Sequence, residues 1–328
     1  GKFEIKGRDA LRFLNMLYTN AFDTLEAGSG RYGLMLSDDG LIIDDGVTFK
    51  LADDHYLMTT STGHADAINQ HMEHFLQIER PDWDVKLTTV TTQWSNATIC
   101  GPRAREVMEA LGCDIDLSPE TFGFMQMREA TVAGIPARVC RVSFTGELSY
   151  EINAWTRHAL ELWQRIKAAG EDFGIEPIGS EANHVLRVEK GFLSLGHEAD
   201  GTTDPHDLGM GWIMSKKKQD YLGKRSVELR RSSGKPRREL VGLRIEEPER
   251  LVTEGAPITP GGRRETSEGL VTACVWSVVH ERAVGLALLT NGRSRIGETA
   301  YVRMKDDVVA ARVTEPCFHD APGARLRS

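Results

Sequence analysis

The sequence predicts an α+β protein of several domains that ends in a small all-β domain. Its 328 residues are more than one hydrophobic core usually holds, so we expect two or three domains. Helical and strand patterns alternate along most of the chain, and only strand patterns remain after residue 238. This tail is typical of a barrel or a sandwich. We therefore place a boundary near residue 235, between a first domain at 1–235 and a second at 236–328.

Four stretches of the first domain have the apolar spacing of amphipathic helices, and they cover residues 7–20, 63–78, 158–170 and 180–191. The last stretch, SEANHVLRVEKG, offers Ser180 as an N-cap and Gly191 as the glycine that ends a helix. We expect a helix in each of the four.

Residues 31–60 predict three strands joined by two tight turns. Asp39-Gly40 is a hairpin signal, and Ala52-Asp53-Asp54 marks the second turn. The segment from Tyr221 to Arg238 is basic, polar and contains Gly and Ser, which favours a linker.

The composition excludes several classes of protein. Hydrophobic content of 40% and charged content of 27% are those of a globular protein, and no run of 18 apolar residues predicts a membrane-spanning helix. A net charge of −8 does not fit a nucleic-acid surface. Five scattered cysteines without a CxxC pair, and no export signal, predict a reducing cytoplasm. The chain begins with Gly1 rather than Met, so we expect a processed product or a piece of a larger polypeptide.

The stretch SDDGLIIDDG, residues 37–46, holds four aspartates. Asp38 and Asp39 suit a turn. In a strand that starts at Leu41, alternation places Asp45 among apolar residues and Asp44 on the more polar face. A calcium loop needs ligands at alternating positions, and Leu-Ile-Ile interrupts them. Asp45 is therefore either a buried structural carboxylate or a catalytic one.

Glu189 is a second carboxylate in an apolar setting. It lies on a predicted helix face with Ala182, Val185 and Leu186. An unpaired buried charge is costly, so Glu189 needs donors. These are either an Arg or Lys side chain or a ligand that presents two adjacent N–H groups.

Other candidate chemistry is weaker. A metal site could be formed by residues 197–206, which include His197, Glu198, Asp200, Asp204 and His206, but the spacing favours an ordered loop and we expect no metal. GxGxxG, Walker A and GxSxG motifs are missing, so no flavin or NAD site is visible. Lys216-Lys217-Lys218 is either a solvated face or a contact for an anionic ligand.

Four motifs follow one another in the chain: DDGLIIDDG, HYLMTTST, RVSFTGELSYEI and LRVEKGFLSLGHEADGTTDPHDLGMGW. Their sequence and order resemble the tetrahydrofolate-dependent aminomethyltransferase family, which includes the T-protein of the glycine cleavage system. The tail segments GLVTACVWSVV, AVGLALL and ARVTEPCF resemble the family's C-terminal barrel. The resemblance covers nearly the whole chain. It implies two α/β lobes around a central folate site, followed by a β-barrel domain.

Within the family, the segments FLNMLYTNAFDTLEAGSGRYGLML and GETAYVRM are most similar to the C-terminal folate domain of the alpha subunit of heterotetrameric sarcosine oxidase. This resemblance implies tetrahydrofolate as the cofactor and flavin-bearing and other subunits as partners. Asp45 matches the family's catalytic aspartate, and Glu189 in LRVE matches its pterin-binding glutamate. The resemblance also implies folate contacts for Tyr56, Met58, Thr60, Phe144, Trp212 and Lys218.

The implied reaction is transfer of the carbon released by sarcosine oxidation to tetrahydrofolate, which forms 5,10-methylenetetrahydrofolate. Asp45 would orient N10 and stabilise developing positive charge. Two other enzymes of the same fold are alternatives, a stand-alone aminomethyltransferase and a folate-dependent demethylase. An alternative of another class is a non-catalytic folate-binding or assembly module.

Overall fold

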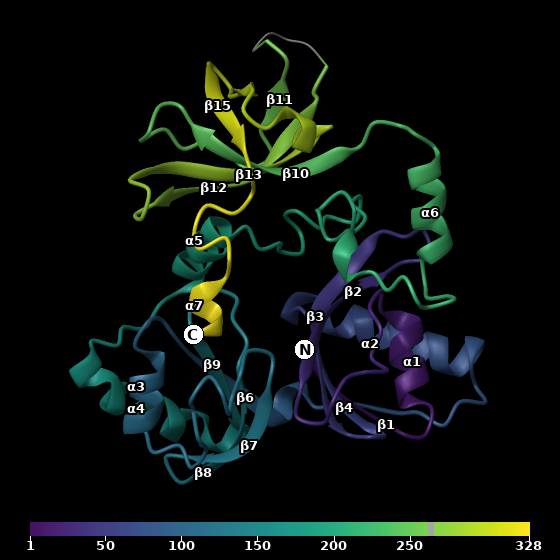
Figure 1. Cartoon of the computed structure of the whole chain (residues 1–328), viewed down its shortest axis with the longest axis vertical. Helices are drawn as coiled ribbons and strands as arrows, with labels where there is room; N and C mark the ends of the chain where they lie inside the picture. Colours follow the sequence, from purple (N-terminus) through teal and green to yellow (C-terminus); the bar gives the residue numbers. More distant parts are fainter. Residues whose placement is uncertain (262–265) are drawn as a thin grey trace.

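The computed structural model describes residues 1–261 and 266–328. It consists of two lobes that lie side by side and a barrel that lies across one end of both (Figure 1). The mixed helix and sheet content and the barrel agree with the fold class that the sequence predicts.

The first lobe is an antiparallel sheet with the strand order β2-β3-β4-β1-β5. Its strands are β1 (Lys2–Lys6), β2 (Gly30–Leu36), β3 (Ile42–Ala52), β4 (His55–Thr59) and β5 (Lys86–Thr89). One face packs against α1 (Ala10–Leu17) and α2 (Ala65–His74), which together bury a core around Phe13, Leu14 and Met72. The other face meets the second lobe, because Phe49 and Leu57 of this face share a cluster with residues of that lobe.

The second lobe is a four-stranded sheet with the order β6-β9-β8-β7. Its elements are β6 (Trp94–Cys100), α3 (Ala104–Ala110), β7 (Met127–Val132), β8 (Ile135–Cys140), β9 (Ser149–Trp155) and α4 (Ala159–Gly170). Buried residues of this lobe, including Met127, Cys140 and Val142, lie in one apolar cluster with Phe49 and Leu57. The two sheets therefore share one apolar contact.

The barrel is closed and contains six strands in the order β10-β13-β12-β11-β14-β15, with β15 pairing back onto β10. The strands are β10 (Arg238–Ile245), β11 (Pro257–Thr259), β12 (Gly269–Ser277), β13 (Arg282–Thr290), β14 (Thr299–Arg303) and β15 (Val308–Thr314). Closure leaves no free edge strand, which protects a sheet of this size from edge-to-edge pairing. After β15 the chain leaves the barrel and ends in α7 (Ala324–Arg327) against the second lobe (Figure 1).

Helix α5 (Ser180–Lys190) connects the barrel with the lobes. Its Val188 shares a cluster with Leu34 of β2 and Leu286 of β13. The helix ends at Gly191, which has a φ of +73°, as the sequence predicts. The N-cap is Gly179 rather than Ser180, and no side chain caps the helix.

The expectation of a linker from Tyr221 to Arg238 is wrong in its first half. Residues Lys224–Ser232 form helix α6, whose Val227 is buried and packs in the same cluster as Val188. The basic and polar residues lie on the other faces of this helix. Because they dominate the composition of the segment, the composition alone did not reveal the buried contact of Val227. The domain boundary near residue 235 falls between α6 and β10, and it remains a prediction.

None of the helices among the described residues combines the length and apolar character that crossing a membrane requires.

Gly191→Ala tests the junction between α5 and the C-terminal segment. A Cβ at this position would lie 2.5 Å from the carbonyl oxygen of Pro316, on a backbone with positive φ. We expect the free energy of unfolding in urea to fall by about 2 kcal/mol or more. Gly201→Ala is the matched control, because Gly201 has a φ of +85° but no atom within 4 Å of the added Cβ. Equal losses in the two variants would contradict the close contact.

Candidate functional site

Strand β3 carries Asp44 and Asp45 on opposite faces of the first sheet. The sequence pattern predicts a polar setting for Asp44 and a buried one for Asp45, and the structure reverses this. Asp44 is fully buried, at 0% exposure, whereas Asp45 is partly exposed. The reason is that α1 and α2 cover the face of Asp44, while the face of Asp45 looks toward the second lobe and α5.

Asp45 is held by two hydroxyl groups. The phenol of Tyr32 donates to its Oδ2 at 2.7 Å, and the hydroxyl of Ser61 donates to its Oδ1 at 3.4 Å. Burial raises the pKa of Asp45, and these two hydrogen bonds oppose the rise. The result is an oriented carboxylate on the face between the lobes.

The register between β3 and β4 shows on which face of the sheet Tyr56 and Met58 lie, and their folate contacts stay a prediction. Tyr56 pairs with Lys50 and Met58 pairs with Thr48, so both side chains lie on the face of Asp44. Both are fully buried in the core beneath α1 and α2 and do not reach the face of Asp45. Thr60 is also buried, and its N–H donates to the carbonyl of Gly1 at 3.0 Å.

The alternate residues of the same segment, Leu57, Thr59 and Ser61, lie on the face of Asp45. Ser61 and Tyr32 were not predicted from the sequence. The turn at Ala52–Asp54 fixes the register of the hairpin, and reading the strand partners outward from that turn would have identified Ser61.

Glu189 lies in the last turn of α5 and is 4% exposed. Its Oε1 accepts a hydrogen bond of 2.5 Å from the hydroxyl of Ser277, at the end of β12. Among the described residues, the side chain that binds the Glu189 carboxylate is therefore Ser277, and not the Arg or Lys considered from the sequence. Ser277 is 88 positions away in the chain, so no local pattern could have identified it.

The neighbours of Glu189 each have their own partner. Arg187 binds Glu198 at 2.6 Å, and Lys190 binds Asp320 at 3.3 Å. The buried part of the helix is therefore its last turn, and not the stripe through Val185 and Leu186 that the sequence suggests. Because Arg187 and Lys190 are paired elsewhere, the side-chain partner of the buried Glu189 carboxylate is the neutral hydroxyl of Ser277.

Residues next to Asp45 and Glu189 belong to one apolar core. Tyr32, which holds Asp45, packs in a cluster with Val185 and Val188 of α5. In Figure 1, β2 and β3 lie on one side of the molecule's centre and α5 on the other, below the barrel. The candidate site is therefore the region bounded by β3, α5 and the second lobe.

The remaining expected contacts are placed as follows. Phe144 is 43% exposed in the loop between β8 and β9, and Trp212 is 75% exposed in a short 3-10 helix. Lys218 is partly buried, and its Nζ donates to the carbonyl oxygens of Tyr18 and Asn20 at 2.5 and 3.0 Å. Burial lowers the pKa of Lys218 to about 7. Its ammonium is thus bound to the backbone rather than extended as a free cation.

The ordered loop expected at residues 197–206 is present. Glu198 is buried between Arg187 and the hydroxyl of Thr272, at 2.6 and 2.7 Å. Asp204 accepts the N–H of His206 at 2.8 Å. Within 1–261 and 266–328, no three His, Cys, Asp or Glu side chains are arranged to hold a metal ion.

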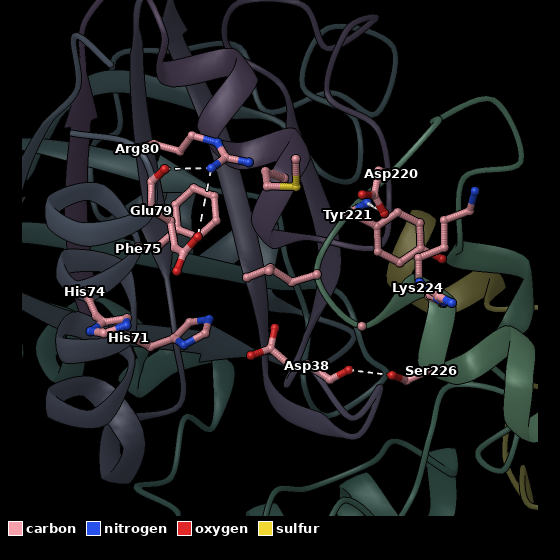
Figure 2. Close-up of a pocket in the computed structure, with 14 residues that line it drawn as sticks. Asp38, His71, His74, Phe75, Glu79, Arg80, Asp220, Tyr221, Lys224 and Ser226 are labelled. Carbon is pink, nitrogen blue, oxygen red and sulfur yellow. Dashed lines mark hydrogen bonds and ion pairs between the residues drawn. The ribbon is translucent and has the colours of Figure 1, made fainter. Parts of the chain in front are cut away.

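A separate recess of about 470 Å³ lies between α2 and the start of α6 (Figure 2). His71 and His74 of α2 face Asp38 and Lys224 across it, and Ser226 donates to the carbonyl of Asp38 at 2.6 Å. Neither Asp45 nor Glu189 lines this recess. Asp38, in the turn of SDDGLIIDDG, thus belongs to a different surface from Asp45.

The fold matches that of a known protein class. The structure of glycine cleavage system aminomethyltransferase T from Bartonella henselae aligns with a TM-score of 0.85 at 21% identity, over 99% of this chain and 84% of that one. This likeness establishes the aminomethyltransferase fold.

Two family models match the chain, the GCVT N-terminal domain over residues 1–218 and the glycine cleavage T-protein C-terminal barrel domain over residues 238–320. The chain belongs to the glycine cleavage T-protein (aminomethyltransferase) family.

Two groups of relatives stand out. The chain is 42% identical over 331 residues to sarcosine oxidase subunit alpha of Corynebacterium sp. strain P-1, and 37% identical over 333 residues to that of Rhizobium meliloti strain 1021. Each alignment covers 99% of this chain and 34% of the relative, so the chain spans about a third of their length. The aminomethyltransferase of Chloroherpeton thalassium is 29% identical over 318 residues, which is 97% of this chain and 84% of that protein.

Glu198→Ala tests the assignment of Glu198 as an internal ion-pair partner. Removing it leaves the buried guanidinium of Arg187 without its counter-charge, and we expect a loss of about 3–5 kcal/mol in the free energy of unfolding. Glu254→Ala is the control, because Glu254 pairs with His197 near the surface and its loss costs less than about 1 kcal/mol. A loss in Glu198→Ala as small as that of the control, measured by urea unfolding, would contradict the assignment.

Proposed function

We propose that this chain catalyses tetrahydrofolate-dependent one-carbon transfer and forms 5,10-methylenetetrahydrofolate. The observation that carries the proposal is the oriented carboxylate of Asp45, held by Tyr32 and Ser61 on the face between the lobes. The family membership of the chain supports folate as the acceptor.

Glu189 is the residue that fits the pterin. Pterin presents a ring N–H beside an amino group, and a carboxylate is the acceptor that such a pair of donors needs. One oxygen of Glu189 is bound to Ser277, which fixes the plane of the carboxylate. Its Oε2 accepts no hydrogen bond from the described residues, so that oxygen is available for a donor from a ligand.

Asp45 supplies the electrostatic part of catalysis. Folate brings the nucleophilic nitrogens, N5 and N10, that take up the carbon. An ionised Asp45 stabilises positive charge that develops near it, and its two hydroxyl partners orient it before the reaction. Phe144 offers an exposed aromatic face for packing beside the ligand.

The carbon donor that we propose is the one-carbon unit released when sarcosine is oxidised. The support is that the chain is 42% identical to sarcosine oxidase subunit alpha of Corynebacterium and only 29% identical to the aminomethyltransferase of Chloroherpeton thalassium. In this proposal the chain acts together with flavin-bearing parts of a sarcosine oxidase complex in the cytoplasm. The five free cysteines fit that compartment.

A titration of the chain, or of the polypeptide that contains it, with tetrahydrofolate tests the acceptor. We expect saturable binding in the wild type and at least about tenfold weaker binding in Glu189→Ala, because the pterin donors lose a charged acceptor. Glu181→Ala is the matched control, since Glu181 is an exposed residue of the same helix. The absence of saturable wild-type binding would remove the proposal.

Asp45→Asn tests catalysis separately from binding. We expect folate affinity to change little, while formation of the methylene product slows by roughly 100-fold or more, because the charge is lost and the shape is kept. Asp38→Asn, in the exposed turn, is the control. Unchanged folate chemistry in Asp45→Asn, together with lost binding in Glu189→Ala, would instead favour a non-catalytic folate-binding module.

Presenting sarcosine-derived formaldehyde, an aminomethylated carrier and a methyl donor in turn distinguishes the proposed reaction from those of an aminomethyltransferase and a demethylase. The proposal requires product from the formaldehyde-level carbon.

A further inference from the structure

A group of buried polar side chains lies behind Asp45, on the face of the sheet that α1 and α2 cover. Its members are Tyr18, Thr19, Asn20, Asp44 and Thr48, and each is at most 4% exposed. Six of their side-chain oxygen and nitrogen atoms have no hydrogen-bond partner among the described residues, including the Tyr18 hydroxyl, Asp44 Oδ2 and the Thr48 hydroxyl. Buried polar atoms are normally paired, so such a concentration calls for an explanation.

Two glycines shape this face of the sheet. Gly33 and Gly46 are paired across β2 and β3, beside Asp44. A Cβ on Gly33 would lie 2.7 Å from Cδ1 of Tyr18 and would also collide with the amide of Asn20. The missing side chain of Gly33 therefore lets Tyr18 and Asn20 approach the strand next to Asp44.

Ser61 connects the two carboxylates across the sheet. Its backbone N–H donates to Asp44 Oδ1 at 3.3 Å, and its hydroxyl donates to Asp45 Oδ1 at 3.4 Å. Asp45 receives a second side-chain donor from Tyr32, whereas no side chain in the described part of the chain donates to Asp44. Donors favour the charged form of a carboxylate, so this arrangement favours charge on Asp45 over charge on Asp44.

The ionisable groups around Asp44 come from three elements. Asp45 follows it on β3, the phenol of Tyr18 comes from the end of α1, and the amino group of Gly1 precedes β1. His64 acts on the neighbouring Asp45. Burial and the charge of Asp45 raise the pKa of Asp44 to about 8, against the smaller opposing effects of Ser61 and Gly1.

We propose that Asp44 is a positioning residue that keeps its proton at neutral pH, so that the Asp44–Asp45 pair carries one negative charge, located on Asp45. A neutral Asp44 removes the cost of a buried anion next to a second anion. It also adds one O–H donor to this group of buried polar side chains. The role of Asp44 in catalysis rests on the proposed function, whereas its protonation does not.

The first test compares urea unfolding of the wild type, Asp44→Asn and the control Asp38→Asn between pH 5 and 8. A carboxyl group whose pKa is raised in the folded state stabilises the fold at low pH, and this contribution is lost as the pH rises toward 8. The unfolding equilibrium constant of the wild type should therefore rise by up to about tenfold per pH unit relative to Asp44→Asn. The control should follow the wild type. Parallel curves for the wild type and Asp44→Asn would overturn the proposal.

A second measurement needs no change at Asp44 and remains valid if Asp44→Asn does not fold. Carbon-13 NMR of aspartate carboxyl groups should show one group in the wild type that titrates near pH 8. In Asp45→Asn this group should titrate at lower pH, because the neighbouring charge is gone. The absence of any carboxyl group that titrates above pH 6 in the wild type would overturn the proposal.

A third measurement distinguishes a positioning role from a structural one. The rate of the folate reaction in the complete enzyme should show an inflection near pH 8 that Asp44→Asn lacks and Asp38→Asn keeps. An inflection that persists in Asp44→Asn would overturn the positioning role. A wild type that binds no folate would remove the proposed function and leave the unfolding and NMR results to decide the protonation of Asp44.

Discussion

The two faces of β3 determine what each of its aspartates can do. A strand places consecutive side chains on opposite sides, and the rest of the structure gives those sides different environments. On one side α1 and α2 exclude water from Asp44. On the other side Asp45 remains partly exposed toward α5 and the second lobe. One step along the chain thus separates a fully buried carboxyl group from a partly exposed one.

The site depends on how firmly α5 is held, because α5 carries Glu189. Its last turn is tied to the loop that follows through Arg187 and Glu198, and to the C-terminal segment through Lys190 and Asp320. Ser277 of the barrel binds Glu189 itself. The barrel therefore holds a carboxylate that belongs to α5, which gives the C-terminal domain a direct contact with the candidate site. Anchoring of this kind keeps a site organised before a ligand arrives, and an organised site loses less entropy on binding.

Local patterns in the sequence revealed much of the fold, since helices α1, α2, α4 and α5, the Asp39-Gly40 hairpin and the barrel strands follow from periodicity and turn residues. The helix at Lys224–Ser232 escaped notice because only Val227 of its face is buried. The predicted burial of Asp44 and Asp45 is the reverse of the observed burial, and the reason is physical. Alternation separates the faces of a strand but does not say which face helices from elsewhere in the chain will cover. Tyr32, Ser61 and Ser277 were missed because cross-strand register and long-range packing bring them to the carboxylates.

A crystal structure of the chain, or of the polypeptide that contains it, with bound tetrahydrofolate would locate the ligand directly. We expect the pterin donors to bind Glu189 Oε2 and N10 to lie within hydrogen-bond reach of Asp45, with Tyr32 and Ser61 still bound to that carboxylate. Folate bound at the recess between α2 and α6, or at any place where it touches neither carboxylate, would contradict this expectation.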